Sequence, residues 1–89
     1  MKAVITVIGK DAVGILAKVS TICAEYSANI IDVNQTVMQD LFAMVMLAEI
    51  DRMSADLGVL RQSLEQLGKQ ENLQIHVMHE DIFNSMHRI

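Results

Sequence analysis

Residues that could carry chemistry gather in one short segment near the start of the chain, Gly9 to Leu16 (Gly-Lys-Asp-Ala-Val-Gly-Ile-Leu). The segment is predicted to lead from a strand into a helix, whose free N–H groups and positive dipole end attract an anion such as a carboxylate. Gly14 permits close approach of a ligand to the backbone, and Asp11 offers a carboxylate to an ammonium group. A purely structural alternative stays open, in which Asp11 caps the helix and Gly14 eases the turn.

Three histidines and one cysteine are further residues with chemical potential. His76 and His79 lie on a predicted strand, where a spacing of three places them on opposite faces and argues against a metal site. Cys23 lies in the apolar stripe of a predicted helix without a basic neighbour in sequence, so we expect a buried hydrophobic side chain. No Ser-His-Asp or paired-carboxylate constellation is apparent. We therefore predict no catalytic residue, no metal site and no cofactor.

The hydrophobic periodicity predicts the elements that must position these residues. Short β-branched or alternating apolar runs predict strands, at 3–8, 31–37, 42–48 and 73–78. Two longer runs with helical spacing predict helices, at 15–26 and 57–71. Ser54 is expected to be the N-cap of the second helix. A short apolar stripe at 82–89 predicts a C-terminal helix.

The order of these elements predicts the fold. Strand, helix, strand, strand, helix, strand is the split βαβ arrangement, so we expect an α+β, ferredoxin-like βαββαβ sandwich with an antiparallel sheet in the order 4-1-3-2 and a short C-terminal helix. The first and third strands are apolar on both faces and suit the centre of the sheet. Both helices then cover one face, and the other face needs the C-terminal tail or a second subunit as its cover.

Composition limits the number of domains and the classes of partner. The 89 residues, 52% of them apolar, fit a single domain over 1–89, with a core over 1–80 and a tail over 81–89. The net charge of -4 has the wrong sign for binding nucleic acid or an anionic membrane. A single cysteine, no signal-peptide pattern and no apolar run near the roughly 20 residues of a bilayer span predict a cytoplasmic protein.

The chain resembles the ACT domain over essentially its whole length, and two stretches of sequence carry the resemblance. They read Gly9-x-Asp11-x-x-Gly14-Ile15-Leu16-Ala17-x-Val19-Ser20 and Asn29-Ile30-x-Asp32-Val33-x-Gln35-Thr36-Val37. ACT domains are small regulatory modules that bind amino acids in many metabolic enzymes and regulators. The chain is most similar in kind to the small stand-alone bacterial ACT-domain proteins.

The resemblance implies a ligand site between two subunits. The loop of one chain and the start of the second strand of its neighbour would supply Asp11, Gly14, Ile15, Leu16, Asn29 and Ile30. Asn29 suits this role because its amide donates to a carboxylate and accepts from an ammonium. Two positions depart from the family pattern, since Val13 replaces a proline often found there and Asp11 stands where some amino-acid-binding members carry Asn.

Two hypotheses for function follow. In the first, the chain is a non-catalytic regulatory module of metabolism that forms a homodimer or larger assembly and binds a small metabolite, expected to be an amino acid, at the subunit interface. In the second, the site is vestigial, because an acid at position 11 repels a ligand carboxylate, and the domain docks to a metabolic enzyme or a transcription regulator.

The chain lacks the residues that other activities of this fold require. The loop after the first strand has no arginine, which an acylphosphatase needs, and no paired cysteines, which a metallochaperone needs. Phe42 is the one aromatic residue of the central strands, which disfavours RNA recognition.

Overall fold

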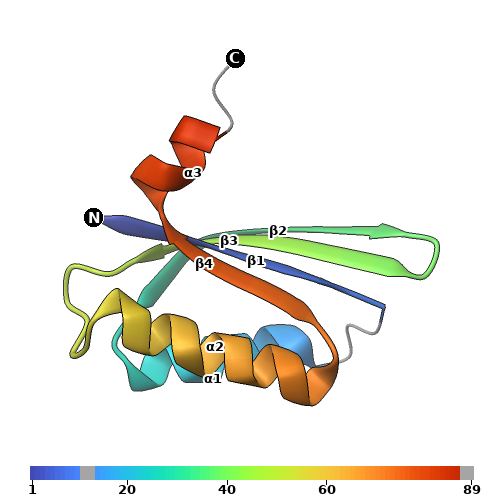
Figure 1. The fold of residues 1–89 in the computed structure, drawn as a ribbon, viewed down its shortest axis with the longest axis horizontal. Helices are drawn as coiled ribbons and strands as arrows, with labels where there is room; N and C mark the ends of the chain where they lie inside the picture. Colours follow the sequence, from blue (N-terminus) through green and yellow to red (C-terminus); the bar gives the residue numbers. More distant parts are fainter. Residues whose placement is uncertain (11–13, 87–89) are drawn as a thin grey trace.

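Four strands form one antiparallel sheet, and two long helices cover one of its faces (Figure 1). The structure, a computed structural model, describes residues 1–10 and 14–86. In chain order the elements are β1 (Lys2–Gly9), α1 (Ile15–Glu25), β2 (Asn29–Met38), β3 (Leu41–Glu49), α2 (Leu57–Glu71), β4 (Gln74–His79) and α3 (Glu80–Met86). The predicted ferredoxin-like βαββαβ arrangement with a C-terminal helix is confirmed.

The sheet has the order β2-β3-β1-β4, which confirms the predicted order 4-1-3-2 and places β1 and β3 at the centre. β1 pairs with β3 from Lys2 opposite Glu49 to Gly9 opposite Phe42. The placement has a physical reason, because a central strand is buried on both faces, and β1 and β3 carry apolar residues at consecutive positions.

The core lies between the sheet and the two long helices. Alternate residues of the central strands point into it, as the period of two along a strand requires. The helices add the buried positions of their apolar stripes. The largest fully buried side chains, each less than 2% exposed, are Ile5, Val7, Val19, Cys23, Met44, Met46, Leu60 and Leu64.

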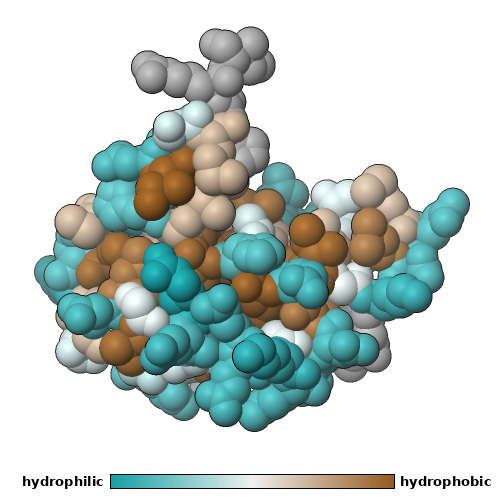
Figure 2. Space-filling view, viewed as in Figure 1, coloured by the Kyte–Doolittle hydropathy of each residue, from teal (hydrophilic) through white to brown (hydrophobic). Residues whose placement is uncertain are grey.

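The short helix α3 covers part of the opposite face of the sheet, above β1 and β4 (Figure 1). Val4 points to that face and is only 4% exposed. Farther along the same face, Ile8 and Val45 keep 43% and 42% of their surface exposed. Figure 2 shows apolar surface below α3 and toward the turn between β2 and β3. Among the described residues, α3 therefore covers one end of this face and the other end is left uncovered.

The edge strand β2 carries an irregularity that changes which residues face the core. Its register on β3 shifts between Ile30 and Asp32, so the intervening Ile31 has no direct partner. In the predicted strand 31–37, Ile31 and Val33 alternate with Asp32 and Asn34, which places Ile31 and Val33 on one face. Because a bulge adds one residue, Ile30 packs against the core instead and Ile31 is 45% exposed.

The helix α2 has the predicted bounds but a different N-cap, and it lies close to β4. Its N-cap is Asp56, so the prediction of Ser54 is wrong. The Ser54 N–H donates to the Tyr26 carbonyl oxygen (3.2 Å) and thereby joins the segment before α2 to the end of α1. At Gly68 a Cβ would lie 2.8 Å from the Leu73 carbonyl oxygen, so the absent side chain lets α2 lie close to β4. Within residues 1–10 and 14–86, no helix is long and apolar enough to cross a membrane.

Candidate functional site

The loop half of the predicted site lies where β1 ends and α1 begins. Gly14 is the N-cap of α1 and has a left-handed backbone (φ 73°), a conformation that other residues adopt at a cost. Ile15 is buried under the sheet, whereas Leu16 is exposed beside it. Asp11 lies outside the described residues. The described part of the loop therefore presents a glycine backbone and an exposed leucine at the start of a helix.

The other half of the predicted site lies at the opposite end of the sheet. Asn29 begins β2 and pairs with Glu49, which in turn pairs with Lys2 at the start of β1. Gly14 follows the far end of β1, and α1 runs back beneath the sheet toward Asn29 (Figure 1). Within one chain the structure therefore keeps Gly14, Ile15 and Leu16 apart from Asn29 and Ile30 by the length of the sheet.

Asn29 lines a hollow of about 350 Å³, together with Ser27, Glu49 and Arg52. We call this the Asn29 hollow. Ser27 lies in the turn between α1 and β2 and Arg52 in the turn that follows β3, whereas Asn29 and Glu49 are the paired end residues of the two strands. The hollow combines a guanidinium, a carboxyl group, an amide and a hydroxyl, which together can meet both an anion and a cation.

Backbone hydrogen bonds fix the two turns that form the Asn29 hollow. The first turn closes through the N–H of Ser27 on the Ala24 carbonyl oxygen (3.1 Å), and Ser27 itself has a left-handed backbone (φ 61°). In the second turn the Met53 N–H donates to the Ile50 carbonyl oxygen (3.2 Å). The bond from Ser54 to Tyr26 described above joins one turn to the other.

Among the described residues, some charged groups around the Asn29 hollow form ion pairs, whereas Arg52 does not. The amino group of Met1 lies 2.9 Å from a carboxylate oxygen of Asp51. The hydrogen bond to Asp51 raises the pKa of the Met1 amino group, and the same bond lowers the pKa of the Asp51 carboxyl. Arg52, the next residue, forms no hydrogen bond or ion pair with any residue in the described part of the chain. Its guanidinium is therefore available to a ligand.

A second hollow, of about 400 Å³, lies at the loop end of the sheet. Its lining consists of Ile8, Gly9, Lys10, Leu41, Glu71, Asn72 and Gln74. It also contains a cation and a carboxylate, but Glu71 forms an ion pair with Lys18 that joins α2 to α1. This hollow is therefore less open to a charged ligand than the Asn29 hollow.

Sequence reasoning found Asn29 but missed Ser27, Glu49 and Arg52. Arg52 follows Asn29 by more than twenty residues, and the two meet only because β3 pairs with β2. The signal that could have found Arg52 is the predicted hairpin itself, because the residues after its second strand must lie beside the start of its first strand.

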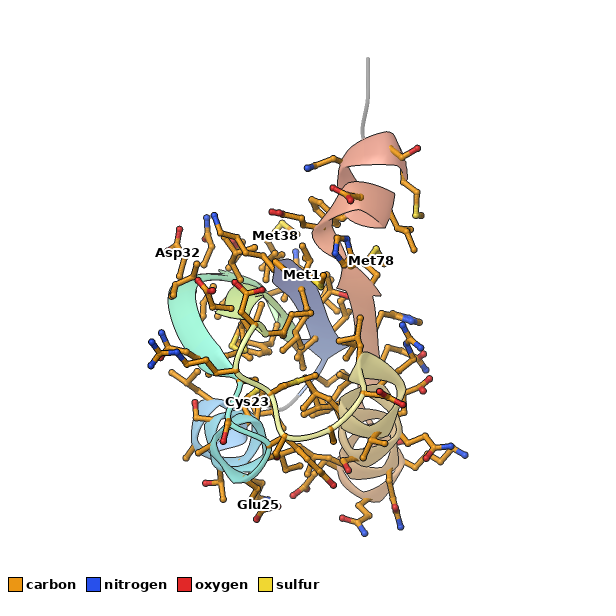
Figure 3. All side chains as sticks on the ribbon, turned by 90° about the vertical axis from the view of Figure 1, so that its left-hand side faces the viewer. Met1, Cys23, Glu25, Asp32, Met38 and Met78 are labelled. Carbon is orange, nitrogen blue, oxygen red and sulfur yellow. The ribbon has the colours of Figure 1, made fainter. Side chains whose placement is uncertain are left out.

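The remaining candidate residues have structural roles or stand apart. Cys23 is 1% exposed on the side of α1 that faces the sheet (Figure 3), and burial raises the pKa of its thiol to about 11. This confirms the prediction of a buried hydrophobic side chain. His76 lies opposite Thr6 and His79 opposite Ala3, on opposite faces as predicted. No cluster of three or more His, Cys, Asp or Glu residues among those described could hold a metal ion.

The two edges of the sheet differ in how they are covered. At β4, Arg61 from α2 donates its Nε–H to the Val77 carbonyl oxygen (3.0 Å). At β2, the strand from Asn29 to Met38 is largely exposed, and Asp32 is its one charged residue. Figure 3 shows Asp32 on the side of the sheet away from the long helices. Long edge strands without lysine or proline are open to pairing with another chain.

Comparisons with known proteins agree on one family. The family model described as "ACT domain" matches residues 2–78. A UPF0237 protein of Methanococcus maripaludis is 50% identical over 86 residues, which cover 97% of this chain and 96% of the relative. The solved structure of an ACT domain protein from Streptococcus pneumoniae has a TM-score of 0.80 and 41% identity, with 93% of each chain covered. The ligand-free regulatory subunit of aspartate kinase from Thermus thermophilus shares the fold (TM-score 0.66, 23% identity, 86% of this chain and 50% of that chain). The chain belongs to the ACT domain family.

Proposed function

We propose that two copies of the chain associate through β2 and bind a small metabolite, an amino acid, at the interface between them. The ACT domain is a regulatory, ligand-binding type of module. The ligand would contact the loop of one copy and the start of β2 of the other, through Asp11, Gly14, Ile15, Leu16, Asn29 and Ile30. Its binding would report the level of the metabolite to a partner, a metabolic enzyme or a regulator.

The observation that carries this proposal is the position of the two half-sites relative to the free edge of β2. Val37, near the end of β2, pairs with Phe42, which pairs with Gly9 at the end of β1. If two β2 strands pair antiparallel across a two-fold axis, Asn29 of the second copy comes to the Val37 end of the first. The start of α1, which follows the end of β1 along the chain, lies at that same end. The symmetric pairing thus brings together the two half-sites that one chain keeps apart.

The chemistry of the half-sites supports an amino acid as the ligand. The amide of Asn29 can donate to a carboxylate and accept from an ammonium. The N-terminus of α1 offers free N–H groups, and Gly14 leaves its backbone accessible, with no atom within 4 Å of a Cβ built there. A site with both sets of groups favours a zwitterion over an ion of a single charge.

A thermal-shift screen against the L-amino acids, together with the variant Asn29→Ala, tests this proposal. A ligand at about 100 times its dissociation constant adds roughly 2.7 kcal/mol of stability. Each kcal/mol moves the midpoint of a domain of this size by about 4 to 8 °C, so binding gives a clear shift. We expect one amino acid to raise the midpoint of the wild type and not of Asn29→Ala. A panel without any shift at millimolar ligand contradicts the proposal.

One observation favours a second function, in which the domain is a protein-interaction module that docks to a metabolic enzyme or a transcription regulator. The supporting observation is the apolar part of the sheet that α3 leaves open, around Ile8 and Val45. The substitution Val45→Lys separates the two functions, because it alters the open face without altering the Asn29 hollow. If amino-acid binding fails in the wild type and Val45→Lys abolishes a partner interaction, the second function replaces the first.

A further inference from the structure

We propose that Arg52 and Glu49 recognise the two charged ends of a free α-amino acid, Arg52 by binding the carboxylate and Glu49 by binding the ammonium. This inference rests on the proposed function and assigns it two specificity-determining residues. Neither residue belongs to the half-sites that the sequence pattern indicates.

The first observation is a pair of opposite charges that face one hollow without neutralising each other. Arg52 and Glu49 both line the Asn29 hollow, and they form no ion pair with each other among the described residues. Asp51, the nearest alternative partner for Arg52 in sequence, is held by the amino group of Met1. The unpaired guanidinium of Arg52 and the carboxyl of Glu49, which also contacts the Asp51 side chain, place both signs of charge on one hollow, as the recognition of a zwitterion requires.

The second observation is that neutral hydrogen-bonding groups also line the hollow. The amide of Asn29 and the hydroxyl of Ser27 complete the lining. Neither side chain makes a hydrogen bond within residues 1–10 and 14–86. An amino acid in the hollow can therefore form bonds to both neutral groups without breaking a bond within the chain.

The third observation is that the hollow is held in shape before any ligand arrives. Its two turns are closed by their own backbone bonds and joined by the bond from the Ser54 N–H to the Tyr26 carbonyl oxygen (3.2 Å). A prearranged set of donors and acceptors binds more tightly than one that must be ordered, because less conformational entropy is lost.

Two other hollows in the described part of the chain differ from the Asn29 hollow in their position or in the pairing of their charges. The residues that line a hollow of about 430 Å³, namely Gln62, Glu65, Gln66 and Lys69, all come from α2, so it is the outer surface of one helix. In the hollow at the loop end, Glu71 is already paired with Lys18. The Asn29 hollow alone, among these three, places an unpaired guanidinium at the β2 edge, where the proposed dimer brings the loop of the second copy.

The experiment measures which charged group of the ligand each residue binds. The amino acid that gives the largest thermal shift is compared by calorimetry with its α-carboxamide, which lacks the carboxylate, and with its 2-hydroxy acid, which lacks the ammonium. The binding variants are Arg52→Gln and Glu49→Gln. The control variants, Lys69→Gln and Glu65→Gln, remove the same charges from the outer surface of α2.

We expect the wild type to bind the carboxamide and the hydroxy acid roughly 10- to 100-fold more weakly than the amino acid. Arg52→Gln should weaken amino-acid binding by a similar factor and bind the amino acid and its carboxamide equally. Glu49→Gln should lose the preference over the hydroxy acid in the same way. Both control variants should bind like the wild type.

Different results overturn different claims. If Arg52→Gln and Glu49→Gln bind the amino acid with unchanged preference, the two roles are wrong, while an amino-acid site at the interface stands. If no amino acid binds the wild type, the proposed function and this inference both fail. Thermal unfolding of each variant without ligand checks that the fold is intact, which we expect because Arg52 has no bond to lose among the described residues.

Discussion

At the scale of single residues, burial keeps a reactive side chain away from ligands, whereas exposure leaves a side chain accessible to them. Cys23 is a potential nucleophile by type, but its thiol faces the core and its pKa is raised by burial. Arg52 and Asn29 are exposed at the rim of a hollow and keep their hydrogen-bonding groups free within the described chain. The side chains available for ligand chemistry therefore lie at the end of the sheet where β2 begins.

The buried thiol of Cys23 predicts a loss of stability at alkaline pH. Burial raises the thiol pKa from 9.0 to about 11, so the unfolded chain ionises first and the thiolate favours unfolding. The stabilising effect is complete below pH 9.0 and is lost as the pH rises toward 11, at up to about 1.4 kcal/mol per pH unit. Denaturant unfolding at several pH values should show this slope in the wild type.

The variant Cys23→Ala isolates the contribution of the thiol from those of other groups that titrate at high pH. The difference in unfolding free energy between wild type and variant should be constant below pH 9 and should change above it in favour of the variant. A difference that stays constant up to pH 11 would show that the thiol is not protected by the fold.

At the scale of elements, one edge of the sheet, β4, is held by α2, and the other edge, β2, is exposed. α2 reaches β4 through the bond from Arg61 to Val77 and through the close approach at Gly68. β2 lies at the opposite edge, with a bulge near its start and a regular segment from Asp32 to Met38 beyond it. The regular segment is the part of the chain best suited to pair with a second copy.

A lysine in the middle of this segment should separate the two copies. In Asn34→Lys, antiparallel pairing around the middle of β2 would place two ammonium groups next to each other across the two-fold axis. Like charges in such a position oppose pairing, so the dissociation constant of the dimer should rise by about tenfold or more. Sedimentation equilibrium measures this constant directly.

The matched control for this prediction is Asn84→Lys, which adds the same charge to the exposed surface of α3. It should self-associate like the wild type. If Asn34→Lys and Asn84→Lys behave alike, the copies do not associate through β2, and the open face of the sheet becomes the better candidate for the interface.

The helices and strands could be predicted from the sequence because their hydrophobic periodicity matches the residues that are buried, except in β2. β1 and β3 are apolar on both faces and occupy the centre of the sheet, as expected of their composition. The bulge at Ile31 was not predictable, because an inserted residue in an edge strand leaves no mark in an alternating pattern. Arg52 was missed for a different reason: the predicted hairpin implies that it lies near Asn29, but only when the pairing of the two strands is followed to their ends.

At the scale of the whole molecule, the proposed ligand holds two copies of the chain together. If the ligand contacts both copies, it stabilises the associated state, and association strengthens binding by the same factor. The 89-residue chain has a thin core, so contacts with a second copy, as proposed, would also add to its stability. Regulation would then depend on how far the ligand shifts the population from one arrangement of the dimer to another.

The central claim, that each binding site takes one half from each copy, can be tested by mixing two defective chains. Gly14→Val alters the loop half and Asn29→Ala alters the other half, so neither variant should bind the amino acid alone. A mixed dimer contains one site with both defects and one site with neither. A one-to-one mixture, allowed to exchange subunits, should therefore recover about a quarter of the wild-type binding capacity at wild-type affinity, measured by calorimetry. Recovery of no binding, with subunit exchange confirmed by native mass spectrometry, would contradict the account and place the site within a single chain.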